Sequence, residues 1–250
     1  MKKRKLRKEA KATLVILLSC CLVFLYYLVS DKDEKPNTDK KEGIVEEKKQ
    51  QKTEKEIKYK VMLDAGHGGY DPGCVSESGA TEKGIVLPIT MRAGEILEQH
   101  GIAVEYTRTS DDIPWENDNA TDLIYRSELA NESDVELFVS IHINFIDENP
   151  DEIKGNEVWY SEKNTGSMEA AEYVLGALAD INYTDNRGLH SDATTPLSVL
   201  YYNRMPSILV ELGFLSNPDD EKFMTSKKGQ EAIANGLAQG VIEYIQTLES

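Results

Sequence analysis

The fold is decided by the stretch LFVSIHI at residues 137–143, a continuous apolar run with a single histidine near its end. Such a short run is typical of a strand that is buried on both faces. Similar runs predict further strands at residues 59–64, 102–107, 157–160 and 207–212. Apolar residues at helical spacing predict helices at residues 82–99, 121–131, 168–181 and 230–247. This alternation predicts an α/β fold, with a twisted mixed, mostly parallel sheet flanked by helices on both faces.

The first 30 residues predict a membrane anchor. Residues 1–11 are a basic flank with seven Lys or Arg, and residues 12–30 are an uncharged run of 19 residues. At ~1.5 Å per residue, a helix of that length crosses a hydrocarbon core of about 30 Å. The positive-inside rule then places the flank in the cytoplasm and the rest of the chain on the cell-wall side of a single-pass anchor.

Two alternatives compete with an uncleaved anchor. A cleaved signal peptide needs a shorter apolar core and a site of small residues, whereas bulky residues from Leu22 to Val29 run to the end of this stretch. A lipoprotein site at Cys20 needs a polar sequence after the cysteine, and the sequence there stays apolar. An uncleaved anchor therefore fits the residues better than either alternative.

The remainder divides into a charged flexible tether, residues 31–57, and an exterior domain, residues 58–250. The tether is rich in Lys and Glu and cannot bury enough apolar surface to fold alone. Residues 59–250 hold 12 Lys or Arg against 34 Asp or Glu, a net charge of −22. A body so acidic repels phosphate backbones, so the composition argues against nucleic-acid binding. Cys74 is the only cysteine after the apolar run, which excludes a disulfide within this domain.

Three residues that can bind or transfer protons lie near the ends of predicted strands. His67 lies in DAGHGG after the first strand, His142 in SIHIN, and Glu211 in VELGF. Ligands bind beyond the carboxyl ends of strands in open α/β sheets, so these side chains are expected to converge. Two imidazoles and a carboxylate suit zinc, but the spacing alone leaves open which carboxylate is the ligand. Of the other histidines, His100 lies at a helix C-terminus and is expected to be structural, and His190 lies in a predicted polar loop.

Five motifs occur in an order that resembles a known family: DAGHGG, TEKGIVLPI, LIYRSELAN, SIHIN and PSILVELGFLSN. Together they resemble the zinc-dependent N-acetylmuramoyl-L-alanine amidases of type 3, over about residues 58–248. The resemblance implies an α/β fold and cleavage of the amide between the muramoyl lactyl group and L-alanine of peptidoglycan. It also implies a Zn²⁺ site made by His67, Glu82 and His142, with Glu211 acting in catalysis. Pro88, inside the predicted helix 82–99, departs from the expected pattern, so the helix either begins near Val86 or has an irregular first turn.

The resemblance predicts a mechanism in which zinc activates water and Glu211 acts as general base and then general acid. Two other functions compete with it: a catalytically inactive, membrane-tethered wall-binding or adaptor protein with this fold, and a zinc peptidase acting between stem amino acids. The presence of all four family residues argues against the first, and the absence of HExxH argues against the second. A spore-cortex role in sporulation or germination and a role in separating daughter cells both fit the chain. An activator protein and the oligomeric state are left open by the sequence.

Overall fold

The computed structural model describes residues 58–115 and 118–249. The predicted anchor at 12–30 and the tether at 31–57 lie outside these residues. Within the part that is described, no helix is both long and apolar enough to cross a membrane.

Six strands form one sheet in the order β2-β1-β3-β6-β4-β5. The strands are β1 (Tyr59–Ala65), β2 (Ile102–Tyr106), β3 (Leu137–Asn144), β4 (Asn156–Tyr160), β5 (Asn186–Ser191) and β6 (Ser207–Phe214). Every neighbouring pair is parallel except β4 and β6, which are antiparallel. The sheet is therefore mixed and mostly parallel, as the sequence predicts.

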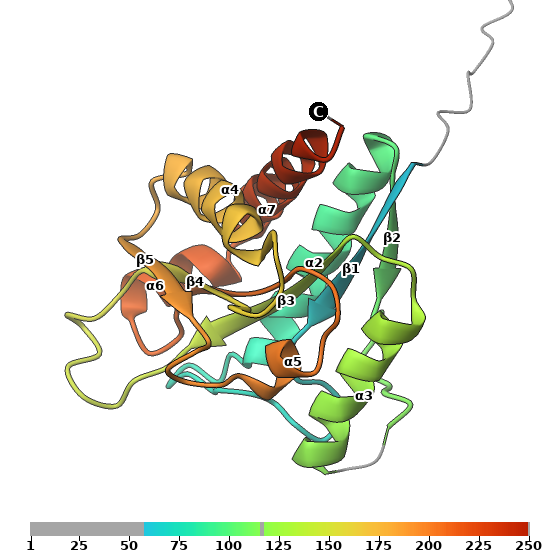
Figure 1. Cartoon of the computed structure of the whole chain (residues 1–250). Coiled ribbons are helices and arrows are strands. Elements are labelled where there is room, and N and C mark those ends of the chain that lie inside the picture. The colour runs from blue at the N-terminus through green and yellow to red at the C-terminus, as the bar shows by residue number, and fades with distance from the viewer. Residues whose placement is uncertain (1–57, 116–117, 250) are drawn as a thin grey trace, which may run out of the picture. The chain divides into compact units, whose positions relative to one another are not determined.

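Six helices of the described residues lie around the sheet (Figure 1). They are α2 (Glu82–Gln99), α3 (Asn119–Glu132), α4 (Ser167–Asp180), α5 (Ser198–Tyr201), α6 (Pro218–Thr225) and α7 (Lys227–Thr247). Side chains along each strand alternate between the two faces of the sheet, so each face builds its own core. On one face, residues such as Val139 and Ile141 pack with α2, α4 and α7 in the larger core. On the other face, Phe138 and Leu209 pack with residues of α3 and α5 in a smaller cluster.

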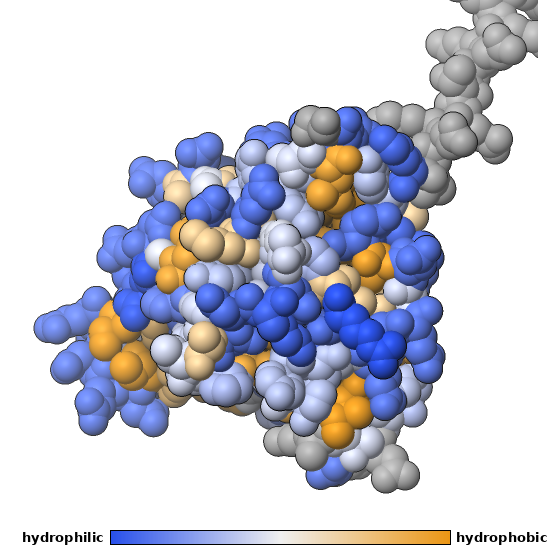
Figure 2. All heavy atoms as spheres, viewed as in Figure 1, coloured by the Kyte–Doolittle hydropathy of each residue, from blue (hydrophilic) through white to orange (hydrophobic). Residues whose placement is uncertain are grey.

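The smaller cluster covers only part of its face of the sheet and leaves the rest free for a functional site. It covers the amino-terminal half of the central strands, where Met62, Phe138 and Leu209 are buried. Four residues further along β3 and two further along β6, the same face carries His142 and Glu211 in place of apolar side chains. The surface around this body is mainly hydrophilic in the view of Figure 2, with apolar residues in small separate patches. Side chains that can bind a ligand or transfer a proton are thus found at the carboxyl edge of the sheet.

The structure corrects the sequence prediction at three elements. Residues around His190 form β5 and not a polar loop, and α5 and α6 were not predicted. β5 was missed because it is an edge strand whose residues, NRGLHS, are exposed or half-buried and show little apolar alternation. The helix α2 begins at Glu82 and continues through Pro88, so it does not start near Val86. Proline removes one helical N–H, and here neighbouring buried residues hold the helix together across it.

Candidate functional site

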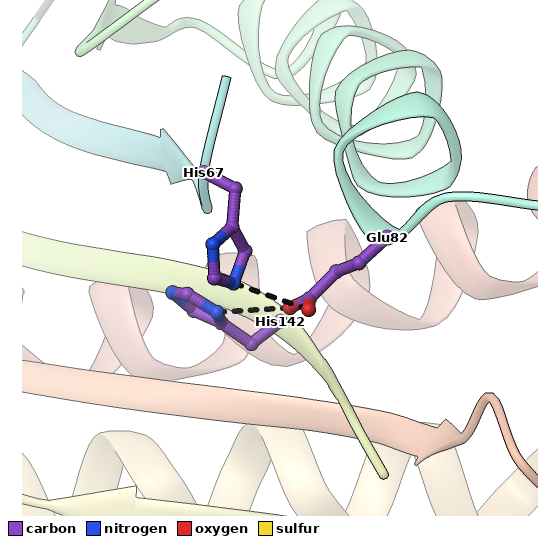
Figure 3. A group of neighbouring side chains, drawn as sticks. All are labelled: His67, Glu82 and His142. Carbon is purple, nitrogen blue, oxygen red and sulfur yellow. Dashed lines mark hydrogen bonds and ion pairs between the residues drawn. The ribbon is translucent and has the colours of Figure 1, made fainter. Parts of the chain in front are cut away.

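Three of the predicted residues meet at the carboxyl edge of the sheet. His67 lies in the loop after β1, Glu82 is the first residue of α2, and His142 is on β3 (Figure 3). His67 Nε2 is 3.1 Å from Glu82 Oε2, and His142 Nδ1 is 3.0 Å from Glu82 Oε1. One ligand atom from each residue lies within 4.8 Å of the others. Glu82 and His142 are 60 positions apart in the sequence, and the fold brings both into one compact group with His67.

The backbone is shaped to bring these side chains close together. A Cβ on Gly66 would strike the His142 ring, and a Cβ on Gly73, whose φ is +67°, would lie 2.5 Å from Glu82 Oε2. His67 itself has φ 59°, a left-handed conformation that is uncommon for a residue other than glycine. Such conformations persist only where the surroundings enforce them. The glycine-rich motif around His67 therefore provides the space in which the cluster forms.

Glu82 is the centre of the cluster and is held as a carboxylate. Its Oε1 accepts a hydrogen bond from the Ile143 amide at 2.9 Å, and its Oε2 accepts one from the Cys74 amide at 3.0 Å. Burial raises the pKa of Glu82, but hydrogen bonds and charge from His142 and His67 outweigh burial and lower it. An ionised carboxylate between two imidazoles is a donor set that suits zinc.

Asp71 holds the His67 ring from the side opposite Glu82. His67 Nδ1 lies 2.7 Å from Asp71 Oδ2, and Asp71 Oδ1 accepts from the Gly73 amide at 3.0 Å. Burial lowers the pKa of His67, but the Glu82 and Asp71 carboxylates outweigh it and raise the pKa to about 9. Carboxylate–imidazole pairs of this kind fix the ring orientation of metal-binding histidines. The sequence analysis missed Asp71, although its position four residues after His67 is a signal that could have found it.

Glu211 lies on β6 beside this cluster, in register with His142 on one side and with Glu157 of β4 on the other. Its Oε2 atom is buried and has no hydrogen-bond partner among the described residues. Burial, followed by the nearby Glu82 and Glu157 carboxylates, raises the pKa of Glu211 well above its usual value. A buried carboxyl oxygen without a partner, next to a possible metal site, is suited to proton transfer.

A buried ion-pair network supports the loop that carries His67. Arg126 of α3 pairs with Asp64 at 2.6 Å and with Asp122 at 2.5 Å. The same guanidinium donates to the carbonyl of Ala65 at 3.0 Å and to that of His67 at 2.7 Å. Arg126 therefore forms structural ion pairs and fixes the backbone of the loop that carries His67.

Next to the imidazoles lies a cavity of about 150 Å³. Leu123 of α3 and Val199 of α5 provide its apolar wall, opposite His67 and His142. Its small volume and apolar wall suit a small substituent of a substrate and not a whole sugar or peptide.

The remaining histidines lie apart from the His-Glu-His cluster. His100 follows α2 at the amino-terminal edge of the sheet, where its Nδ1 is 2.8 Å from the Ile96 carbonyl oxygen, which agrees with a structural role. His190 stacks on Trp159 at 4.8 Å between ring centroids, and its Nε2 lies 3.6 Å from Glu157 Oε2. Glu157 and its β5 partner Arg187 could not be found from the sequence, because only the sheet order places them beside Glu211.

The fold and the site define an α/β protein with a His-Glu-His cluster and a buried glutamate at the carboxyl edge of its sheet. Residues 61–243 match the family Amidase_3, described as N-acetylmuramoyl-L-alanine amidase. Since this match spans more than half of the chain, the chain belongs to that family. The protein is thus a peptidoglycan hydrolase of the N-acetylmuramoyl-L-alanine amidase type.

Individual relatives agree with the family match. A germination-specific N-acetylmuramoyl-L-alanine amidase of Bacillus subtilis is 30% identical over 191 residues, covering 74% of this chain and 78% of the relative. The structure of the amidase AmiC2 of Nostoc punctiforme matches with a TM-score of 0.68 and 34% identity, covering 76% of this chain and 99% of that one. The CwlD amidase of Clostridioides difficile, solved in complex with the GerS lipoprotein, matches with a TM-score of 0.70 and 31% identity, covering 76% and 99%. The α/β fold predicted from the sequence is the fold of these amidases.

Proposed function

We propose that this amidase is zinc-dependent and that His67, Glu82 and His142 hold the ion. The observation that carries the proposal is the group of three ligand atoms within 4.8 Å, in which Glu82 is ionised and both its oxygens accept backbone hydrogen bonds. Bound there, zinc would supply Lewis-acid polarisation of the lactyl carbonyl and would acidify a water molecule.

Glu211 moves the proton in the proposed reaction. Its Oε2 takes a proton from the attacking water and then gives one to the nitrogen of the departing L-alanine. Two features support this assignment: the buried Oε2 atom lacks a partner, and Glu211 is the register neighbour of His142. Asp71 orients His67, and Arg126 fixes the loop backbone.

The first prediction concerns Glu211. In Glu211→Gln we expect release of stem peptides beginning with L-alanine to fall by about 10²–10⁴-fold, because the amide cannot accept and return the proton. The bound zinc, measured by metal analysis of the purified protein, should stay at the wild-type level. Release is followed by labelling new N-terminal alanine on purified peptidoglycan and by mass spectrometry of the stems.

The controls separate catalysis from metal binding. Glu148→Gln changes an exposed carboxylate and should leave activity and zinc unchanged. His142→Ala should lose both, because it removes a ligand. Loss of zinc in Glu211→Gln would instead make Glu211 a ligand, and wild-type activity that survives complete removal of metal would contradict the zinc proposal.

We further propose that the domain acts at the outer face of a cell membrane, tethered through residues 12–30 and 31–57. The uncharged run of 19 residues after a basic flank supports this location. Full-length protein should remain in the membrane fraction after a high-salt wash, and a variant lacking residues 12–30 should be released. Recovery of both proteins in the soluble fraction would contradict the anchor.

A role in spore germination, with an activator protein, is proposed from the relatives. One relative is a germination-specific amidase, and one solved neighbour was captured with a lipoprotein. If this role is correct, the protein should release stems from spore-cortex peptidoglycan more readily than from vegetative walls. Equal activity on both wall types would favour the daughter-cell separation role.

A further inference from the structure

Beyond Glu211, the sheet carries a group of charged and aromatic side chains that the proposed chemistry does not use. Glu157 of β4 is the register partner of Glu211, so both carboxylates lie on the same face of the sheet. Four side chains contact the Glu157 carboxylate, one of them Asn144 of β3, whose Nδ2 donates to Oε1 at 3.4 Å. Arg187 Nε lies 2.9 Å from Oε2, Trp159 Nε1 donates to Oε1 at 3.1 Å, and His190 Nε2 lies 3.6 Å from Oε2.

Within this group, the buried Glu157 holds the Arg187 side chain in position, and Arg187 is the residue that solvent and a ligand can reach. The Glu157 side chain is 7% exposed, whereas that of Arg187 is 39% exposed. A buried carboxylate is costly unless it is paired, so Glu157 holds the guanidinium strongly in place. The guanidinium also lies over the Phe214 ring, 5.0 Å from its centroid, which further restricts its position.

A β-bulge in β5 directs Arg187 toward this position. Asn186 pairs with Asn156 and Leu189 pairs with Val158, so Arg187 and Gly188 together face the single residue Glu157. Gly188 has φ +93° and nothing within 4 Å of a built Cβ, so glycine is required there by the backbone conformation and not by lack of space. Bulges beside active sites often re-aim a side chain, and this one presents Arg187 on the face of Glu211.

The guanidinium retains free donors for a ligand. Arg187 uses Nε for Glu157, and its Nη1 and Nη2 groups make no hydrogen bond or ion pair with the described residues. The planar guanidinium fork matches a carboxylate with two parallel hydrogen bonds. Because the exterior part of the chain has a net charge of −22, a carboxylate-bearing substrate needs such a local cation near the site.

We propose that Arg187, positioned by Glu157, binds a carboxylate of the stem peptide and makes the enzyme select stems whose carboxylates are free over amidated stems. The proposal rests on the amidase function above and adds a substrate preference to it. From His142 to Glu157 there are two strand spacings, roughly 10 Å. An extended peptide advances about 3.3–3.6 Å per residue, so the carboxylate belongs to roughly the second or third stem residue.

The experiment compares two muropeptides with the full-length protein. They share one sequence, and the carboxylates of the second and third stem residues are free in one and amidated in the other. Dissociation constants come from calorimetry, and kcat and KM come from release of the stem peptide. Wild-type protein should bind the free-carboxylate muropeptide about tenfold more tightly, the value of one charge-assisted pair of hydrogen bonds. Arg187→Gln should abolish this preference through KM, with kcat changed by less than about threefold. Arg187→Lys should restore part of it, since lysine keeps the charge without the fork.

Two further variants control the result. Arg204→Gln removes an exposed arginine just before the start of β6, at the end of the strand opposite Glu211, and should keep the full preference. Glu157→Gln should weaken the preference, because it loosens Arg187, while leaving Arg187 available for contact. Equal wild-type affinity for both muropeptides, or a preference that survives in Arg187→Gln, would overturn the proposal.

The readouts keep this proposal separate from the proposed function. Failure of the wild-type protein to hydrolyse either muropeptide would contradict the amidase function, whereas calorimetry still decides whether the free carboxylate is preferred. If Arg187→Gln does not fold, Arg187→Lys and the two-muropeptide comparison on wild type still test the subsite.

Discussion

His67 is held from both sides of its ring, by Glu82 at Nε2 and by Asp71 at Nδ1. The residue also adopts a left-handed backbone conformation that the surrounding glycines and the Arg126 hydrogen bond to its carbonyl maintain. Neighbouring side chains therefore fix the orientation of the His67 ring and the backbone that carries it. Asp71 and Asp64 give the two predictions at the scale of residues.

Asp71→Asn should weaken zinc binding by about 10- to 100-fold, because the amide no longer fixes and polarises the His67 ring as a carboxylate does. Competition between the protein and a zinc chelator of known affinity measures the change. Asp112→Asn, an exposed carboxylate in the loop after β2, is the matched control and should bind zinc as wild type does. Unchanged affinity in Asp71→Asn would show that the pair is not needed to orient the ligand.

Asp64→Asn should destabilise the fold by about 3–5 kcal/mol, because it removes one of the two carboxylates that pair with the buried Arg126 guanidinium. Burial raises the pKa of Asp64, but Arg126 and hydrogen bonds from Ser140 and Thr107 outweigh it and lower the pKa from 3.8 to about 2. Since the folded pKa is the lower one, the carboxylate stabilises the fold fully above about pH 4 and loses this effect as the pH falls toward 2.

Urea unfolding at neutral pH and between pH 4 and 2 checks both parts of this prediction. The difference between wild type and Asp64→Asn should shrink as the pH falls through that window. Asp147→Asn, an exposed carboxylate, should show neither the loss nor the pH dependence. A constant difference across the window would mean that the charge of Asp64 is not the source of the stabilisation.

At the scale of elements, α6 links the end of β6 to the start of β4. Asn217 caps this helix by accepting from the amides of Asp219 at 3.0 Å and Asp220 at 3.3 Å, and its Nδ2 donates to the Pro150 carbonyl at 2.9 Å. Asp220 then accepts from the amides of Phe214 at 2.9 Å and Gly155 at 3.1 Å. The cap thus holds both strands that carry Glu211 and Glu157.

Asn217→Ala should cost about 1–2 kcal/mol, because it removes the helix cap and the hydrogen bond to Pro150 in the loop before β4. Chemical unfolding of the purified variant measures the loss. Asn217→Asp keeps the capping oxygen and should recover most of the stability. Equal losses in the two variants would show that the Pro150 contact, and not the cap, carries the effect.

The helices and strands differ in how far the sequence alone predicts them. The buried strands and the amphipathic helices were predicted because burial imposes an apolar pattern with a period of 2 or 3.6 residues. The edge strand β5 has no such pattern, since one side of it lacks a neighbouring strand and most of its residues are exposed or half-buried. α6 was missed because it is short, although Asn217 followed by Pro218 is a cap signal that could have found it.

For the whole molecule, the proposed zinc ion would join three separate elements: the loop after β1, the start of α2, and β3. An ion that binds only the folded state stabilises that state in proportion to its occupancy. No disulfide joins these elements among the described residues, where the cysteine Cys74 is free, and the proposed ion would join them instead.

Removal of zinc should therefore lower the melting temperature. At a zinc concentration a thousand times the dissociation constant, the stabilisation is about 4 kcal/mol, or roughly 10 °C for a domain of this size. Scanning calorimetry with zinc, with chelator and with zinc restored tests this. His142→Ala should melt at one temperature in all three conditions, and a wild-type melting temperature that ignores the chelator would contradict folding-coupled zinc binding.

The amino-acid pattern was enough to predict the fold class, the central strands and the residues His67, Glu82, His142 and Glu211 as candidates for one site. This was possible because buried strands impose apolar runs, and because the motifs around these residues resemble those of one family. The support of His67 by Asp71, and the position of Glu157 and Arg187 beside Glu211, became visible in the folded chain alone. Those contacts depend on sheet order and on a bulge in β5, and strands that are distant in the chain become neighbours only when the sheet forms.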